Sequence, residues 1–180
     1  MTFWEEGNSG LNCMDKMKER LSRIKLLLMD VDGVLTDGKI SYLGKEEFTS
    51  FHVQDGMGIV IAQKKGLKIG WVSSRQSISL LTRGESLKVS YLYLGRENKI
   101  KAVQEIAGNE QICLEEIAYI GDDINDLPVF RSVGVKFAVA NARDELKEKA
   151  DLVTKNKGGE GAVREVIELI LKAKGLWEYQ

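Results

Sequence analysis

Two aspartates follow a short apolar segment near the start of the chain. Residues 26–29 read Leu-Leu-Leu-Met; Asp30 follows at once, and Asp32 stands two positions further on. A dense apolar run of this length before a turn is typical of a strand that is buried on both faces. Burying a carboxylate is costly unless a partner compensates its charge. The sequence therefore predicts that a bound cation stabilises the acids at the end of this strand.

Other residues suited to phosphate or to a hard cation also follow apolar segments. Ser73, Ser74 and Arg75 come after a second apolar run, and Lys99 stands at the start of a predicted helix. The acidic sequence GDDIND then occupies residues 121–126. The acids in these segments offer only oxygen ligands, without histidine or cysteine, and this donor set favours Mg²⁺ over zinc or copper.

Such a collection of residues is suited to phosphoryl transfer. A metal ion neutralises the charge of a phosphate and allows an aspartate to attack phosphorus, which forms an aspartyl-phosphate. A second acid two residues along would protonate the leaving oxygen and later activate water. A serine and a lysine would hold the phosphoryl oxygens by position and charge.

Alternating strands and helices must position these residues. The predicted fold is α/β, a Rossmann-like parallel sheet with helices on both faces, in which the carboxyl ends of the strands gather at one edge. Two alternating segments around the sequence GKE predict a β-hairpin inserted after the first strand. The expected strands are 25–29, 67–72, 90–94, 117–120, 135–139 and 152–153, the hairpin strands are 39–43 and 47–53, and the expected helices are 12–22, 55–65, 77–87, 98–107, 125–132, 142–149 and 161–174.

Length and composition indicate one globular domain with a real core, because 180 residues contain 43% apolar and 29% charged residues. We expect residues 1–24 to form an N-terminal extension to a domain of residues 25–180. The net charge of −1 gives no electrostatic reason to bind nucleic acid or an anionic membrane. No apolar run approaches the ~20 residues of a membrane span. Cys13 and Cys113 match no zinc spacing and no signal peptide is evident, so we expect a reduced, cytoplasmic protein.

The order of these motifs resembles that of the haloacid dehalogenase superfamily of phosphohydrolases. The sequence DVDGVLTDG corresponds to the first motif of that superfamily, Ser73 to the second, Lys99 to the third and GDDIND to the fourth. The resemblance implies that Asp30 is the nucleophile and Asp32 the general acid and base. It also implies that Ser73, with Ser74 beside it, and Lys99 bind phosphate.

The same resemblance implies the ligands of the metal. Asp30, the backbone carbonyl of Asp32, and Asp122 would hold Mg²⁺, whereas Asp126 would orient the metal's surroundings and Asp123 would add to them. The two aspartates at the first strand would then be tolerated because the metal stabilises their charge.

One branch of the superfamily is especially similar. DVDGVLTDG, FHVQDGMG, GDDINDLPVF and GGEGAVREV together resemble the family of 3-deoxy-D-manno-octulosonate 8-phosphate phosphatases, from about residue 25 to residue 171. This resemblance implies a domain without a cap, because only about two dozen residues separate Asp32 from the next helix. It also implies a homotetramer assembled through the hairpin, a sugar-phosphate substrate, and a place in the synthesis of lipopolysaccharide precursors.

Two departures from the branch concern substrate recognition. Ser73-Ser74-Arg75 stands where Thr-Gly-Arg is common, so the hydroxyl and the arginine are kept. An arginine here implies an eight-carbon sugar acid, since a guanidinium pairs well with a carboxylate. Glu160 stands where a basic residue is often found, although Arg164 remains nearby. We count Arg75, Arg164 and His52, the only histidine, as the candidates for binding the substrate.

Other functions stay open at this point. The alternative substrates are a nine-carbon sugar-acid 9-phosphate and a broad set of small phosphates. A non-enzymatic phospho-receiver domain also combines strand-end acids, a hydroxyl and a lysine. A receiver places its acceptor aspartate after a middle strand, with the acid pair before it, and this chain has its acid pair first. The glycines of NKGGEGAV fit no phosphate-loop spacing, and we expect them to form a mobile segment before the last helix.

Overall fold

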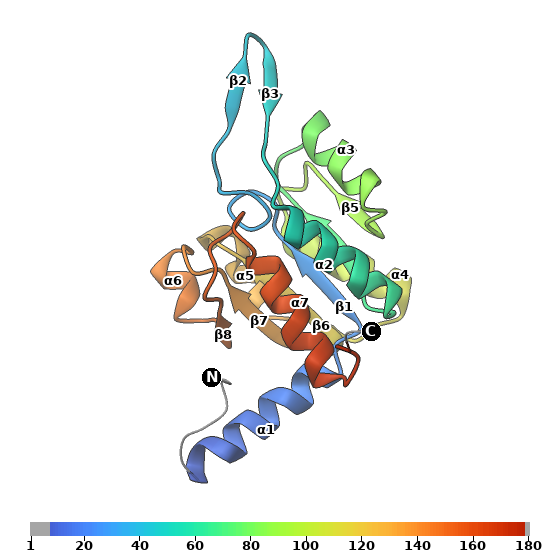
Figure 1. Cartoon of the computed structure of the whole chain (residues 1–180), viewed down its shortest axis with the longest axis vertical. Helices are drawn as coiled ribbons and strands as arrows, with labels where there is room; N and C mark the ends of the chain where they lie inside the picture. Colours follow the sequence, from blue (N-terminus) through green and yellow to red (C-terminus); the bar gives the residue numbers. More distant parts are fainter. Residues whose placement is uncertain (1–7, 179–180) are drawn as a thin grey trace.

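The structure is a computed structural model that describes the backbone of residues 8–178 and the side chains of residues 14–178. Its centre is a six-stranded, all-parallel sheet in the order β5-β4-β1-β6-β7-β8 (Figure 1). The predicted fold class is therefore confirmed. The strands are β1 (Leu26–Met29), β4 (Lys68–Val72), β5 (Tyr91–Tyr93), β6 (Ile117–Gly121), β7 (Val135–Ala138) and β8 (Leu152–Val153).

Strand β1 lies in the middle of the sheet, and all four of its residues are buried, as its apolar run predicts. Met29 pairs with Trp71 of β4 on one side and with Ile120 of β6 on the other. The three strands therefore end side by side, so the residues that follow β1, β4 and β6 meet at one edge of the sheet.

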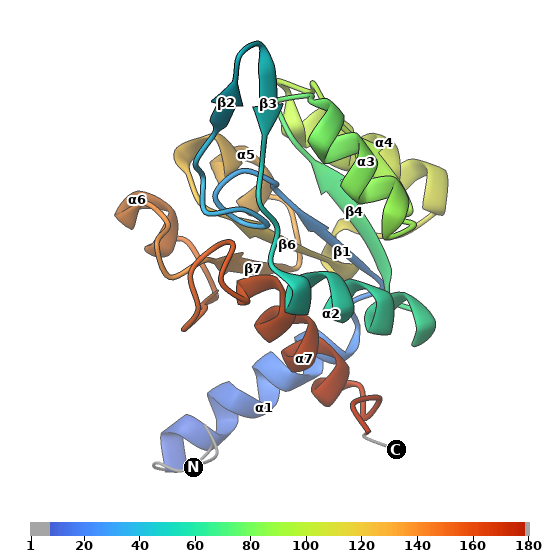
Figure 2. The ribbon, with the colours of Figure 1, turned by 45° about the horizontal axis from the view of Figure 1, so that its top comes forward.

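Helices cover both faces of the sheet (Figures 1 and 2). Helices α2 and α7 lie side by side on one face, and α4 and α5 lie on the other. Helix α7 buries one apolar face, which consists of Val163, Val166, Ile167, Ile170 and Leu171. The helices are α1 (Asn8–Ser22), α2 (Val53–Lys64), α3 (Ile78–Ser86), α4 (Lys99–Glu110), α5 (Leu127–Phe130), α6 (Asp144–Lys147) and α7 (Ala162–Ala173).

The N-terminal helix α1 packs against α7 (Figure 2). Leu21 at its end is buried in the core, and Arg20 forms a double hydrogen bond to Asp151, at 3.0 and 2.9 Å. The helix begins at Asn8 rather than at residue 12 as expected. The expected N-terminal extension is therefore helical from residue 8, and residues 1–7 lie outside the described part.

Between β1 and α2 the structure contains only a small hairpin, which projects from the sheet and confirms the absence of a cap domain (Figure 1). Its strands, β2 (Ser41–Leu43) and β3 (Glu46–Phe48), are shorter than predicted. The two-residue turn begins at Gly44, whose φ of 63° lies in the left-handed region.

Several helix ends differ from the expectation. Helix α4 continues beyond the expected end at residue 107 to Glu110, and Gln111 takes the left-handed conformation that glycine adopts most easily. The amide of Ile112 then bonds to the Ala107 carbonyl, which closes the helix. The expected helix 125–132 is a 3₁₀ turn (Ile124–Asp126) followed by α5, and the expected helix 142–149 is limited to α6. No helix among residues 8–178 is long and apolar enough to cross a membrane.

Candidate active site

Three carboxylates meet at the carboxyl edge of the sheet. Asp30 follows β1, whereas Asp122 and Asp126 follow β6, and each offers an oxygen within 4.8 Å of those of the other two. We call these three residues the acid cluster. The prediction that distant segments bring Asp30 and Asp122 together is confirmed.

A buried lysine holds two members of the acid cluster. Lys99 Nζ lies 2.5 Å from Asp30 Oδ2 and 2.7 Å from Asp126 Oδ1, and only 3% of Lys99 is exposed. Lys99 is the first residue of α4, and the Asn98 side chain caps that helix by accepting from the Lys101 amide. The cap therefore fixes the point from which Lys99 reaches the aspartates.

Asp126 is fully buried and fully bonded, unlike an ordinary loop aspartate. Its Oδ1 also accepts from the Tyr119 hydroxyl at 2.8 Å, and its Oδ2 accepts from the Asp122 amide at 3.1 Å. A Cβ on Gly121 would lie 2.4 Å from Asp126 Oδ2. Glycine at position 121 is therefore what allows this carboxylate to fold back against the end of β6.

The electrostatics of the acid cluster favour a bound cation. Burial, and then repulsion from Asp126, raise the pKa of Asp30 to about 6, although Lys99 opposes the shift. Burial, followed by repulsion from Asp30 and Asp126, raises the pKa of Asp122 to about 7. Burial alone would lower the pKa of Lys99, but the two neighbouring carboxylates outweigh it and raise that pKa. Three carboxylates facing one lysine leave two negative charges, which suits a divalent ion.

The donor set also fits magnesium. The acid cluster offers only carboxylate oxygens, the ligands that hard cations such as Mg²⁺ prefer. The chain backbone comes close to the cluster at Gly33, where φ is 79° and a Cβ would lie 2.0 Å from Asp122 Oδ2. A side chain at position 33 would thus fill the space beside Asp122 that an ion needs.

The carboxylate of Asp32 lies outside the acid cluster. Arg75 holds it by two hydrogen bonds, Nε to Oδ2 at 2.8 Å and Nη2 to Oδ1 at 2.5 Å. The third guanidinium nitrogen of Arg75 lies 2.6 Å from Glu47 Oε1 on the hairpin. Asp126, which the resemblance assigns to the surroundings of the metal, is the third member of the acid cluster. The role of the Asp32 carbonyl as a metal ligand stays a prediction.

The two predicted phosphate-binding serines differ in exposure. Ser73 follows β4 and is buried, and its Oγ accepts from the Arg75 amide at 3.1 Å. Ser74 is exposed. Because β4 pairs with β1, Ser73 lies at the same edge of the sheet as Asp30.

The structure does not bring the side chain of Arg164 to the acid cluster. Its Nε bonds to Glu168 at 2.8 Å, and its guanidinium lies 4.8 Å from the centre of the Trp177 ring. His52 precedes α2, and its Nδ1 is buried without a partner among the described residues. Substrate binding by His52 and by Arg164 stays a prediction, which for Arg164 requires the side chain to leave Glu168.

Sequence reasoning missed Asp55, which joins α2 to α7. Its carboxylate is 1% exposed and accepts from the Arg164 amide at 2.7 Å, at the first turn of α7. Burial raises the pKa of Asp55, while the hydrogen bond from the Arg164 amide opposes this shift. The available signal was a single acid in the first turn of the α2 segment, within the sequence FHVQDGMG, since a carboxylate is suited to binding the amides at the start of a helix.

The glycine segment before α7 is held against the first loop, so the expectation of a mobile segment is wrong. The Gly159 amide donates to the Val34 carbonyl at 3.0 Å, and a Cβ on Gly158 would lie 1.7 Å from the Gly33 carbonyl oxygen. The glycines thus allow two backbones to touch beside the acid cluster, and Glu160 next to them is exposed.

Comparison with known proteins agrees with this geometry. Residues 91–167 match the family of haloacid dehalogenase-like hydrolases. The 3-deoxy-D-manno-octulosonate 8-phosphate phosphatase of Yersinia pestis is 42% identical over 162 residues, which are 89% of this chain and 86% of the relative. The enzyme of that name from Moraxella catarrhalis, solved with magnesium, phosphate and KDO, has a TM-score of 0.87 at 37% identity and covers 90% of this chain and 94% of its own. A cobalt-bound form from Haemophilus influenzae has a TM-score of 0.84 at 39% identity, with 87% and 92% covered.

The parallel sheet and the acids after β1 and β6 define a haloacid dehalogenase-like hydrolase. Relatives of this class in the comparison are phosphomonoesterases, and two of the solved structures carry magnesium or cobalt. The chain belongs to the family of 3-deoxy-D-manno-octulosonate 8-phosphate phosphatases.

Proposed function

We propose that this protein hydrolyses 3-deoxy-D-manno-octulosonate 8-phosphate to the free sugar acid and phosphate, with Mg²⁺ and through an aspartyl-phosphate. One observation carries the proposal. Asp30 stands at the end of the central strand, bonded to Lys99 and within 4.8 Å of two further carboxylates. A carboxylate beside a fixed cation and a metal-binding group is what an attack on a phosphate dianion requires.

In the first step an oxygen of Asp30 attacks phosphorus, and the bond from phosphorus to the sugar oxygen breaks. The Asp30 oxygens are oriented for this, because Oδ1 accepts from the Val31 amide at 2.6 Å and Oδ2 from Lys99. Asp32 gives its proton to the leaving sugar oxygen. In the second step Asp32 takes a proton from water, which attacks phosphorus and releases Asp30. Asp30, Asp122 and the backbone carbonyl of Asp32 would hold the magnesium ion, and Asp126 would orient its surroundings; the ion would neutralise the charge of the phosphate.

Arg75 links the proposed chemistry to the substrate. Its guanidinium is shared between Asp32 and Glu47, so Asp32 can transfer a proton only after this pairing loosens. The carboxylate of a sugar acid would compete for the same guanidinium. This competition favours an acidic sugar phosphate over a neutral one, and it supports the eight-carbon acid that the resemblance implies. A role in the synthesis of lipopolysaccharide precursors follows from that substrate, while the cytoplasmic location stays a prediction.

The substrate is tested by measuring phosphate release from a panel of esters, with Mg²⁺ and with a chelator. We expect the highest kcat/KM for the eight-carbon acid, a lower value for a nine-carbon sugar-acid 9-phosphate, and the lowest for a neutral sugar phosphate. Arg75→Ala should lower kcat/KM for the eight-carbon acid by about 10- to 100-fold, because a charge-assisted pair contributes about 1.5–3 kcal/mol. The same substitution should lower kcat/KM for the neutral ester much less.

The same panel separates the alternatives. Equal kcat/KM values for acidic and neutral esters would favour a broad phosphatase, and a preference for the nine-carbon acid would replace the proposed substrate. A receiver domain would take up one phosphoryl group from a phosphodonor and release it slowly, whereas the proposed enzyme turns over many times and stops when the metal is removed.

The hairpin supports the proposal of a homotetramer. Tyr42, Leu43 and Phe48 on its strands are 67%, 70% and 47% exposed. A hairpin that presents apolar side chains to solvent is suited to an interface between subunits. A neighbouring subunit seated there would lie beside the same edge of the sheet as Glu47 and the acid cluster.

Replacing Leu43 and Tyr42 by serine tests the assembly. We expect the wild-type protein to elute at the mass of a tetramer in size-exclusion chromatography with light scattering, and the double variant to elute at a smaller mass. Val153→Ser, which changes an exposed apolar residue on the far strand β8, is the matched control. A wild-type monomer, or a double variant that remains tetrameric, would contradict assembly through the hairpin.

A further inference from the structure

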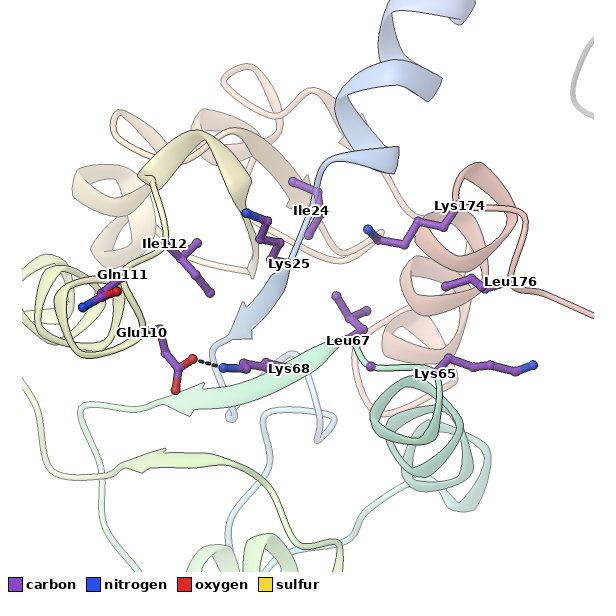
Figure 3. Close-up of a pocket in the computed structure, with 11 residues that line it drawn as sticks. Ile24, Lys25, Lys65, Leu67, Lys68, Glu110, Gln111, Ile112, Lys174 and Leu176 are labelled. Atoms are coloured by element: carbon purple, nitrogen blue, oxygen red, sulfur yellow. Dashed lines mark ion pairs between the residues drawn. The ribbon is translucent and has the colours of Figure 1, made fainter.

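A second cavity lies at the amino-terminal edge of the sheet and occupies about 340 Å³ (Figure 3). Lys25 precedes β1 and Lys68 begins β4, whereas Asp30 and Ser73 follow the opposite ends of the same strands. The length of β1, at ~3.3 Å per residue, separates the two ends by roughly 13 Å. The cavity is therefore separate from the acid cluster.

The lining of this cavity is strongly positive, since it contains four lysines from three segments and a single glutamate. Lys68 forms an ion pair with Glu110, and Lys25 forms one with Glu116 at 2.6 Å. Within the part of the chain that the structure describes, Lys65 and Lys174 form no ion pair. The four lysines of the lining therefore face two glutamates, Glu110 and the Lys25 partner Glu116, which also attracts Lys174, so the cavity keeps an excess of positive charge. The charged residues of the lining are Lys25, Lys65, Lys68, Lys174 and Glu110.

Lys174 is the lysine best placed to bind an anion. Its ammonium group reaches from the end of α7 toward Lys25, while the side chain of Lys65 points outward from α2 (Figure 3). Lys174 Nζ donates one hydrogen bond, to the Ser22 carbonyl at 2.7 Å, and has two further donors. Burial, and then repulsion from Lys25, lower the pKa of Lys174. A bound anion would relieve this repulsion.

Apolar side chains complete the lining. Ile24, Leu67, Ile112 and Leu176 belong to it (Figure 3); Ile24 and Leu67 are buried, whereas Ile112 is half-buried and Leu176 is exposed. A cavity that combines cations with apolar side chains is suited to a small organic anion, because the charged group meets the lysines and the carbon skeleton covers the apolar atoms.

We propose that this cavity is a second, non-catalytic site, which binds a small organic phosphate monoester. The dianion of such an ester suits this excess of positive charge, and Lys174 with Lys25 beside it would face the anion, since Lys65 points outward. This proposal is independent of the substrate of the acid cluster, since the two sites share no residue.

Phenyl phosphate is a suitable probe, because it joins a phosphate dianion to an apolar ring. We would titrate the wild-type protein with it in the presence of a chelator, which removes metal from the acid cluster, and follow backbone amide shifts by NMR. Saturable shifts are expected at Lys25, Gln111 and Lys174. Lys174→Gln should weaken this binding about fivefold, as removal of one partly exposed charge does. Glu110→Gln removes the negative charge of the lining and should strengthen binding by a similar factor.

Lys172→Gln is the matched control, because it removes a charge from the same helix outside the cavity and should leave the affinity unchanged. The side chain introduced by Lys174→Gln can still donate to the Ser22 carbonyl, so this variant should fold. Glu110→Gln provides an independent test should Lys174→Gln fail to fold. Shifts confined to the acid cluster would overturn the proposal. So would cavity shifts with equal affinity in the wild type, Lys174→Gln and Glu110→Gln.

Discussion

Asp30→Asn is expected to lower kcat by about 10⁴-fold or more, because an amide cannot form the phosphoryl bond and the two-step route is lost. The variant should remain folded. Lys99 keeps its bond to Asp126 at 2.7 Å. The substitution also removes a buried carboxylate, and burial together with repulsion from Asp126 raises the pKa of that carboxylate to about 6. Multiple-turnover phosphate release with Mg²⁺ measures the effect, and thermal unfolding monitors the fold.

Two further measurements make this test specific to the nucleophile. Wild-type protein quenched in acid during turnover should retain labelled phosphate covalently, and Asp30→Asn should retain none. Asp144→Asn, which changes a 93% exposed aspartate side chain on α6, should match the wild type in both measurements. Substantial turnover by Asp30→Asn in a preparation free of wild-type enzyme would remove Asp30 as the nucleophile, while the family and the fold would stand.

The meeting of Asp30 with Asp122 was predictable because the topology of a parallel sheet decides it. Apolar strands flanked by helices require crossovers, which bring the carboxyl ends of β1 and β6 to one edge whatever the side chains are. Strand positions, the fold class and the inserted hairpin follow from the same periodicity. The alternation of strands and helices therefore indicates the edge of the sheet at which these carboxylates meet.

The direction of individual side chains was not predictable in the same way. Asp126 joins the acid cluster, and the Asp32 side chain leaves it for Arg75, although both acids belong to motifs that the sequence displays. Asp126 can join the acid cluster because Gly121 leaves space for its carboxylate. The Asp32 side chain turns away from the cluster because it pairs with Arg75, which is distant in the chain. Such choices are made by packing and pairing in three dimensions, which spacing along the chain does not encode.

Arg164 is an intermediate case, because its placement had a local signal. Glu168 lies four residues further along the same helix, and such a spacing favours an ion pair on the helix surface. The resemblance pointed instead to the substrate. The tertiary structure also decides where helices end. Helix α4 ends at Glu110 rather than near Gly108, because Ile112 then packs against the core.

Lys99→Met is expected to produce the largest loss of stability of any change in the site. The lysine is buried between Asp30 and Asp126, and its removal leaves two buried carboxylates without a cation. Removing one partner of a buried ion pair costs about 3–5 kcal/mol. We expect a lower midpoint of urea unfolding in the metal-free protein and a loss of turnover, whereas Lys101→Met, at an exposed position of the same helix, should change neither.

The pH dependence of this loss distinguishes electrostatics from simple packing. In the folded wild type the pKa of Asp30 is already raised from 3.8 to about 6, and that of Asp122 to about 7, so ionisation of these groups disfavours the folded state. Without Lys99 both pKa values should rise further. Because the unfolded chain then binds fewer protons than the folded one above pH ~4, stability falls as the pH rises from about 4 to beyond 7. The destabilisation by Lys99→Met should therefore be small near pH 5 and large near pH 8, and Mg²⁺ should restore part of it. An equal loss at both pH values would mean that Lys99 acts by filling space, and that the charge balance inferred for the acid cluster is wrong.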